Sequence, residues 1–272
     1  MGVKVAALQL SSGHEVAANL DAIEGLTREA VDAGAQLVAL PENCAFLGLK
    51  DTDKLAIAEE PGAGPIQERL AGLARSLGVW LVAGTIALKL AGTPRVAAAC
   101  LVYDAQGRLA GRYDKIHLFD VDIPERGEIY RESANIAPGK SPIVVEIPFG
   151  KLGLSVCYDV RFPELYRQLA AQGAQVLLVP SAFTVPTGRA HWEVLLRARA
   201  IENLCCLVAP AQWGVHSNGR ETFGDTMIVD HWGRVLARRP TGPGWVLAEL
   251  DLDAQARARR DFPALGHRRL PG

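Results

Sequence analysis

The chain alternates short, continuous apolar runs with segments whose apolar residues recur at helical spacing. In the first half this spacing predicts two helices, at residues 18–34 and 64–78, the second with Pro65 near its start and Gly78 just past its end. The apolar runs around the helices have the length of strands. We therefore expect strands at 3–10, 35–42 and 79–88, and two more within 95–115 that are joined by a turn at Gln106-Gly107.

The second half repeats this order of elements. Helical spacing predicts helices at residues 163–173 and 189–203. Apolar runs bounded by Gly, Pro and Asp predict the strands around them. These are a hairpin over 141–157, strands at 174–182 and 204–212, a hairpin over 225–239, and a last strand at 244–252.

The arrangement of these elements predicts an α/β fold. The apolar runs are continuous rather than alternating, so we expect sheets that are covered on both faces. Two similar halves, each with strands and two helices, indicate a single-domain, four-layered α-β-β-α sandwich over residues 1–272. The basic segment at about 253–272 is expected to be a C-terminal arm, packed on a neighbour or solvated. Residues 115–142 break the pattern and, being rich in Pro, Gly and charge, are typical of a functional loop.

Composition and charge narrow the classes of function. The formal net charge of −1 gives no electrostatic reason to expect a nucleic acid or an anionic membrane as partner. No apolar run is long enough for a membrane span, and the N-terminus lacks the pattern of a signal peptide. Five cysteines, an odd number without an export signal, favour a reduced, cytoplasmic protein. No Cys/His spacing fits zinc, so we expect no structural metal.

Three of the predicted strands lead into an ionisable side chain. Glu42 follows the run LVALP, Lys115 follows RLAGRYD, and Cys157 follows LGLSV. Ligand crevices of α/β sheets lie at the carboxyl ends of strands, so the three groups can meet in one pocket. Taken singly, each also has an ordinary explanation, as a loop carboxylate, a surface cation and a small core residue.

Together, these three groups suit nucleophilic acyl chemistry. A thiol has little thiolate near neutral pH, and a nearby carboxylate can accept its proton and later return it to a leaving amine. An ammonium can stabilise the thiolate and the oxyanion of a tetrahedral intermediate. The backbone N–H of Tyr158 is expected as a second oxyanion donor. Pro163 is expected to begin the next helix, whose N-terminus favours developing negative charge.

The segments that carry these groups resemble a known family. LPE at 40–42, YDKIHLFD at 113–120 and GLSVCYDVRFPELYR at 153–167 resemble the three signature segments of the nitrilase superfamily of carbon–nitrogen hydrolases. The likeness continues through 180–203 and 222–237, so it covers nearly the whole chain in order. It implies a cofactor-free amidase that forms a homodimer or a larger homo-oligomer.

The resemblance also implies roles for individual residues. Glu42 would be the general base, Lys115 would support the tetrahedral intermediate, and Cys157 would be the acylated nucleophile. A second glutamate that positions the reacting groups falls at Glu132 rather than at Glu128, because a serine and the sequence APG follow it.

Within the superfamily, the segments 187–203 and 205–216 most resemble the amidases that act on deaminated glutathione. The next most similar branch is that of the omega-amidases, which act on monoamides of 2-oxo dicarboxylic acids. Both imply a small amide with a free carboxylate. Arg161 is the residue we expect to bind that carboxylate, unless it instead pairs with a nearby acidic residue of its own segment. Phe183 and Thr187 are expected on the substrate side of the loop, next to Arg189, where proline is usual in the animal relatives.

Other reactive residues have structural explanations that we favour. His117 is expected to support Lys115 from outside the site, and His191 to pack at the start of a helix. Cys205 and Cys206 are expected to be inert core, and the roles of Cys44 and Asp159 stay open.

Two further hypotheses remain at this point. One is a different acyl chemistry, that of a nitrilase or of an N-carbamoyl hydrolase. The other is an inactive family member that acts as a scaffold or as a redox sensor through its cysteine.

Overall fold

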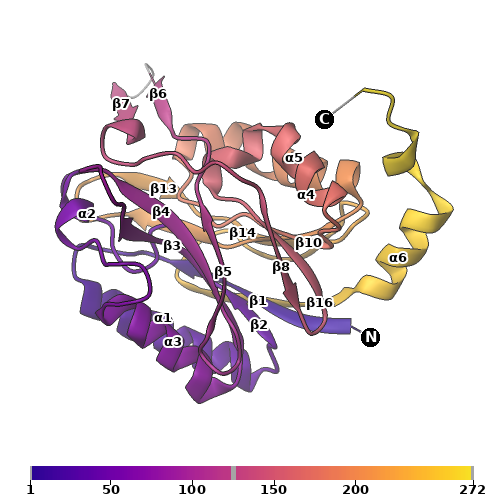
Figure 1. Cartoon of the computed structure of the whole chain (residues 1–272), viewed down its shortest axis with the longest axis horizontal. Coiled ribbons are helices and arrows are strands. Elements are labelled where there is room, and N and C mark those ends of the chain that lie inside the picture. Colours follow the sequence, from indigo (N-terminus) through magenta and orange to yellow (C-terminus); the bar gives the residue numbers. More distant parts are fainter. Residues whose placement is uncertain (1, 124–126, 271–272) are drawn as a thin grey trace.

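The chain folds around two β-sheets that lie face to face, as seen in a computed structural model that describes residues 2–123 and 127–270. Helices cover the outer face of each sheet (Figure 1). The first sheet has eight strands. In its order they are β13 (Glu221–Phe223), β12 (Ala211–Val215), β1 (Gly2–Leu10), β2 (Leu37–Ala39), β3 (Trp80–Lys89), β4 (Val96–Tyr103) and β5 (Leu109–Asp114), with β16 (Gly244–Asp251) also paired to β1.

The second sheet has six strands, contributed by the second half of the chain. Its central strands β9, β10 and β11 are parallel, as the helical connections between them require. In order, the strands are β15 (Val235–Arg239), β14 (Thr226–Val229), β11 (Cys206–Ala209), β10 (Val176–Leu178), β9 (Gly150–Leu154) and β8 (Ile143–Ile147).

Two pairs of helices form the outer layers. The helices α1 (Val16–Asp32) and α3 (Pro65–Leu77) pack on the first sheet, whereas α4 (Pro163–Ala171) and α5 (Val185–Asn203) pack on the second (Figure 1). The α-β-β-α sandwich expected from the sequence is therefore present. The short helix α2 (Asp53–Ala56) lies at one end of the sandwich.

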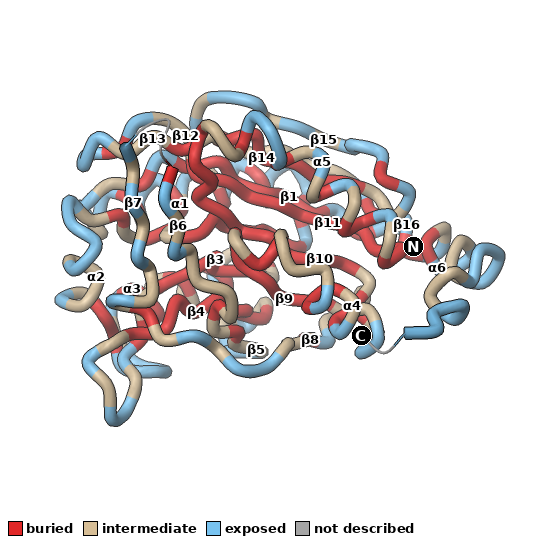
Figure 2. Tube along the Cα trace, turned by 90° about the horizontal axis from the view of Figure 1, so that it is seen from above, coloured by how far each residue is buried: buried red, intermediate tan, exposed pale blue. Residues whose placement is uncertain are grey.

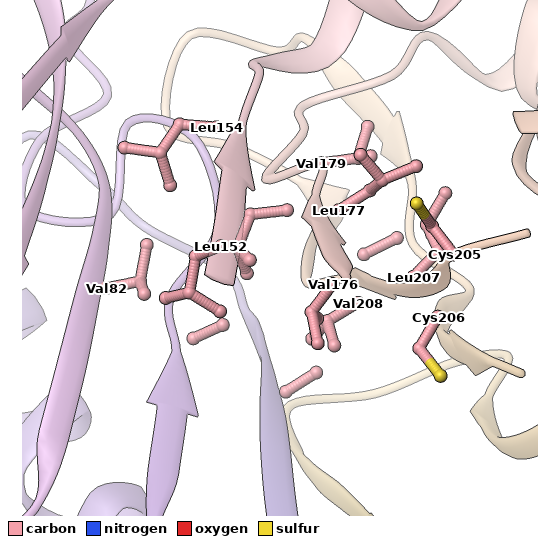
Figure 3. Close-up of a cluster of buried hydrophobic side chains, with 14 of the residues drawn as sticks. Val82, Leu152, Leu154, Val176, Leu177, Val179, Cys205, Cys206, Leu207 and Val208 are labelled. Carbon is pink, nitrogen blue, oxygen red and sulfur yellow. The ribbon is translucent and has the colours of Figure 1, made fainter. Parts of the chain in front are cut away.

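The alternation of side chains along the strands divides the core into layers. In β1, Val5 and Ala7 face the second sheet, while Ala6 and Leu8 belong to the cluster under α1 and α3. The buried trace in Figure 2 runs through the strands of both sheets. Figure 3 shows the inter-sheet layer, in which Leu152 of β9 and Val82 of β3 approach each other. This dry layer fixes how the strand ends of one sheet lie over those of the other.

One predicted strand proved to be two. The expected strand at 204–212 divides at Pro210 into β11, in the second sheet, and β12, in the first. Proline has no N–H to donate to a ladder, so the strand cannot continue through it. The chain therefore crosses between the sheets here, and the predicted strand was wrong at this point.

The stretch 115–142 is more regular than its composition suggested. It contains the antiparallel pair β6 (Asp120–Ile123) and β7 (Glu128–Arg131), followed by the 3-10 turn η2 (Glu132–Ala134). Within it, residues 124–126 lie outside the described residues. The pair projects at one end of the sandwich (Figure 1).

The basic C-terminal segment begins as a helix that is hydrogen-bonded to other parts of the same chain. In α6 (Leu252–Asp261), the side chains of Gln255 and Arg259 donate hydrogen bonds to the backbone oxygens of Gln175, Ala174 and Leu204 at 2.7–3.0 Å. The short 3-10 turn η4 (Ala264–His267) follows. No helix in the described ranges is both long and apolar enough to cross a membrane.

Candidate active site

Cys157 lies on a tight turn after the end of β9. It begins the 3-10 turn η3 (Cys157–Arg161), and its φ of +48° is in the left-handed region, where a side chain is strained. Its N–H donates to the oxygen of Pro180 at 2.9 Å, whereas the N–H of Tyr158 finds no acceptor in the part of the chain that is described. Pro163 then begins α4, as the sequence predicted. The turn thus combines a thiol with an unused backbone donor.

Glu42 reaches the same place from the end of β2. Its side chain is buried, and one carboxylate oxygen accepts the N–H of Ala182 at 2.9 Å. The next residue, Asn43, also has a left-handed φ, of +55°, and its N–H donates to Thr85 Oγ1 at 2.8 Å. The side chain of Gln212 donates to the backbone oxygen of Glu42 at 2.9 Å. The general-base candidate is therefore held from both sheets.

Lys115 directly follows β5 and is buried between two carboxylates. Its Nζ lies 2.8 Å from Glu42 Oε1 and 2.9 Å from both oxygens of Glu132. Glu132 also accepts the N–H of Phe119 at 2.6 Å. Glu128 instead accepts the hydroxyl of Tyr130. Glu132, which the sequence favoured over Glu128, is thus the glutamate that contacts Lys115.

Mutual interactions set the charge states of these groups. Burial would raise the pKa of Glu42, but the ammonium of Lys115 outweighs it, and the pKa lies below its ordinary value. Burial would lower the pKa of Lys115, but the carboxylates of Glu132 and Glu42 hold it well above its ordinary value. Burial, and then the charge of Glu42, raises the pKa of the Cys157 thiol. The resting site therefore holds a carboxylate, an ammonium and a neutral thiol.

Asp159, whose role the sequence left open, joins the Cys157 turn to the Lys115 segment. It is fully buried and accepts the N–H of Val156 at 2.8 Å and the hydroxyl of Tyr113 at 2.7 Å. Its other oxygen accepts the N–H of His117 at 3.0 Å and lies 2.7 Å from Nδ1 of that ring. Asp159 thus links the end of β5 to the turn, and His117 lies outside the reacting groups, as expected.

A cavity that is partly open to solvent lies over these groups. It contains every catalytic and substrate-binding residue that the sequence predicted, namely Glu42, Lys115, Glu132, Cys157, Tyr158, Arg161, Phe183 and Thr187.

Arg161 lines one side of this cavity. Its guanidinium lies 5.8 Å from the ring centre of Tyr158 and 5.1 Å from that of Phe183, and it contacts His191 at 3.2 Å. Among the ion pairs of the described residues, none involves Arg161. The structure therefore does not have the alternative, in which Arg161 pairs with an acidic neighbour of its own segment. Its guanidinium can bind an anionic ligand.

The cavity also contains residues that the sequence did not single out. Arg220, Lys54, Tyr130, Phe119 and Asn43 all line it. Arg220 follows the Asn218-Gly219 turn, but a cation after a hairpin turn is ordinary and gave no functional signal. These residues come from loops and short elements whose position depends on tertiary packing.

The remaining reactive residues lie away from this cavity. Cys44 is in the core, where burial raises its pKa to about 12. Arg189 faces a separate hollow beside Asp225 and Arg238. Within residues 2–123 and 127–270, no group of His, Cys, Asp and Glu side chains is arranged to hold a metal ion.

Known proteins resemble this chain over nearly its whole length. The family model described as carbon-nitrogen hydrolase matches residues 4–260. The chain is 46% identical over 267 residues to a deaminated glutathione amidase of Synechocystis sp., covering 97% of each chain. It is 42% identical over 267 residues to the deaminated glutathione amidase of Yersinia enterocolitica, covering 98% of this chain and 93% of the relative.

Solved structures show the same fold. The NitFhit protein of C. elegans matches with a TM-score of 0.92 at 38% identity, covering 98% of this chain and 65% of that longer chain. A mutant amidase from Nesterenkonia sp. matches with a TM-score of 0.78 at 29% identity, covering 98% of this chain and 97% of that one. In that structure the acetamide moiety of fluoroacetamide is covalently attached to the active-site cysteine.

Proposed function

The chain belongs to the carbon–nitrogen hydrolase family, and on that premise we propose that it cleaves a small linear amide of the deaminated glutathione type, using Cys157 as nucleophile. It is a hydrolase of carbon–nitrogen bonds other than peptide bonds. The names of its relatives support the substrate, and so does an unpaired guanidinium, that of Arg161, in the cavity. Such a group binds the carboxylate of the acyl half in a bidentate way.

In the first half of the reaction, Cys157 Sγ attacks the amide carbon while Glu42 takes the thiol proton. The carbonyl oxygen becomes an oxyanion, stabilised by the Lys115 ammonium and the N–H of Tyr158. The carbon–nitrogen bond then breaks, and Glu42 gives the proton to the leaving amine. A thioester remains on Cys157.

In the second half, a water molecule attacks the thioester and Glu42 takes one of its protons. The carbon–sulfur bond breaks, the thiol regains its proton from Glu42, and the carboxylic acid leaves. Glu132 acts through Lys115 by holding the ammonium in place. The enzyme returns to its starting protonation state, so the cycle needs no cofactor.

One observation carries this proposal. A buried carboxylate with a lowered pKa and a thiol with a raised pKa line one cavity, and an ammonium lies 2.8 Å from the carboxylate. A neutral thiol that shares a cavity with a base suits a nucleophile that is activated only during attack. It suits a redox sensor poorly, because sensor cysteines are accessible thiolates.

The test is Cys157→Ala, measured by product release from deaminated glutathione. Turnover should fall by about a thousandfold or more, and intact-mass measurement should find the acyl adduct in the wild type but not in the variant. A matched control is Cys100→Ala, in the buried core. It should lose about 1 kcal/mol of stability but keep its turnover.

The same assay separates the competing chemistries. Deaminated glutathione, 2-oxoglutaramate, a nitrile and an N-carbamoyl amino acid would be compared by kcat/KM. A wild-type enzyme that prefers the nitrile or the carbamoyl compound would overturn the proposed substrate, and normal turnover in Cys157→Ala would overturn the nucleophile.

The surface supports a homodimer or a larger homo-oligomer. Exposed apolar side chains of Ile201, Trp232 and Phe262 gather where α5, the β14–β15 turn and the end of α6 meet. A contiguous exposed apolar patch favours a protein partner, and a second copy of the chain is the partner that we propose. The cysteines of the chain are all free, which favours the reducing cytoplasm as its location.

A further inference from the structure

The active-site cavity has a second guanidinium that forms no ion pair among the described residues, that of Arg220. In the described ranges no ion pair involves Arg220, and its Nε is buried without a hydrogen-bond partner. Its guanidinium stacks on the ring of Tyr130, 4.6 Å from the ring centre. A buried donor without an acceptor is costly unless a ligand supplies one.

A row of aromatic rings lies between the two guanidinium groups. Arg161 is over Tyr158, whose ring contacts Phe119 at 5.1 Å between centres; Phe119 contacts Tyr130 at 5.0 Å, and Tyr130 lies under Arg220. All five residues line the same cavity. These contacts form one series of rings with a guanidinium stacked at each end of the series.

The two cations also belong to different elements of the site. Arg161 is in the same 3-10 turn as Cys157, whereas Arg220 is in the β12–β13 hairpin, whose Gln212 donates to the backbone oxygen of Glu42 at 2.9 Å. In the proposed reaction the acyl half stays on Cys157, while Glu42 gives its proton to the departing amine. The Arg161 end therefore corresponds to the acyl half, and the Arg220 end to the amine half.

Lys54 of α2 adds a positive charge to the Arg220 end. Within the described part of the chain it has no ion pair, and burial lowers its pKa. Asp51 also lines the cavity, but it is exposed and forms no ion pair among the described residues. Glu128 accepts the hydroxyl of Tyr130, and Arg131 pairs with Asp122 at 2.7 Å. Within the described ranges, Arg220 and Lys54 are thus the cations at this end that have no carboxylate in an ion pair with them.

We propose that Arg220, assisted by Lys54, is the group that binds the amine-half carboxylate of a substrate with a carboxylate on each side of the cleaved bond. This assignment rests on the proposed function and extends it. Deaminated glutathione has this form, because its acyl half carries a 2-oxo acid and its amine half ends in a glycine carboxylate. An omega-amide such as 2-oxoglutaramate has a carboxylate only on the acyl half.

Binding to the inactive Cys157→Ala enzyme tests the assignment without turnover. The two probes are deaminated glutathione and the same compound with its glycine carboxylate converted to the primary amide, measured by titration calorimetry. Cys157→Ala should bind the acid about 10- to 100-fold more tightly than the amide, as charge-assisted hydrogen bonds predict. Adding Arg220→Gln should reduce that ratio to near one, while Arg220→Lys should keep part of it.

Two control variants in the same background distinguish a local effect from a general one. Arg131→Gln removes a cavity cation that already has a partner, and it should keep the ratio. Arg161→Gln should weaken both probes equally.

Three results would overturn the assignment: equal affinity of the two probes for Cys157→Ala, a ratio that Arg220→Gln leaves unchanged, or no binding of either probe. Failure of the proposed function is a separate result, in which the wild-type enzyme releases no product from deaminated glutathione.

Discussion

At the residue scale, the proposed mechanism makes activity depend on the charges of Glu42 and Lys115. In that mechanism Glu42 must be ionised to accept the thiol proton, and its pKa lies below the ordinary 4.5. The pKa values of Cys157 and Lys115 are both raised, so neither group changes charge near neutrality. One acidic limb is therefore expected in the pH profile.

We predict that kcat/KM stays constant from mildly alkaline pH down to below the ordinary carboxyl pKa and then falls. The depressed pKa of Glu42 in the folded state contributes stability that is present above its unfolded pKa and is lost as pH falls through the folded value. Circular dichroism at each pH would separate loss of structure from protonation of Glu42. An activity limb near neutral pH, with the fold intact, would contradict this assignment of charges.

Asp159 also belongs to the residue scale, because one buried carboxylate joins two catalytic segments. Its four contacts fix the turn before Cys157 and the residues on both sides of Lys115. A buried carboxylate needs such partners, and here they are supplied by the segments that carry the chemistry. Asp159 is therefore a positioning residue that acts through Cys157 and Lys115.

At the element scale, the close packing of β3 against the end of β2 positions Glu42. Gly84 of β3 has no room for a side chain, since a Cβ there would lie 2.2 Å from the oxygen of Leu40 and 2.3 Å from that of Pro41. Those two residues lead directly to Glu42. The glycine thus allows the strand end to approach.

We predict that Gly84→Ala displaces the Leu40–Pro41 segment and with it Glu42. Stability should fall by about 1–3 kcal/mol, and kcat/KM by about a hundredfold, because misplacement of a catalytic group by about 1 Å has that effect. Steady-state kinetics and thermal unfolding measure the two effects.

The control is the same substitution at Gly25, in α1, where a Cβ would meet nothing within 4 Å. Gly25→Ala should stabilise the protein by about 0.5–1 kcal/mol and leave kcat/KM unchanged. If Gly84→Ala lowered only the melting temperature, the link between this packing and Glu42 would be wrong.

At the scale of the whole molecule, the exposed apolar patch formed by Ile201, Trp232 and Phe262 predicts self-association. Ile201 is 47% exposed in the single chain, so Ile201→Glu should cost the isolated chain little. A buried, unpaired glutamate in a dimer interface would be costly. Sedimentation velocity should find the wild type as a dimer or larger and Ile201→Glu as a monomer.

The matched control is Leu109→Glu, at an apolar side chain on β5 that is similarly exposed. It should sediment like the wild type. A wild-type protein that sediments as a monomer would remove the support for this interface.

The sequence by itself determined the layers and brought forward the three residues proposed as catalytic. Continuous apolar runs and helical periodicity are local signals, and they located nearly all strands and helices of the sandwich. Glu42, Lys115 and Cys157 could be singled out because each follows a strand, and strand ends of an α/β fold meet at one edge. The register of Glu132 rested on its neighbours in the sequence, and the structure has it in contact with Lys115.

Three features were decided by tertiary structure alone. They are the crossing of the chain between the two sheets at Pro210, the hydrogen bonds by which Asp159 joins two segments, and the position of the Arg220 guanidinium in the cavity. The sequence gives a continuous apolar run at 204–212, and only packing determines that β12 pairs with β1 of the other sheet. Arg220 and Lys54 come from a hairpin turn and a short helix without a periodic signal of their own. Long-range contacts place these two cations in the same cavity as Glu42, the proposed general base. Local sequence patterns do not encode such contacts.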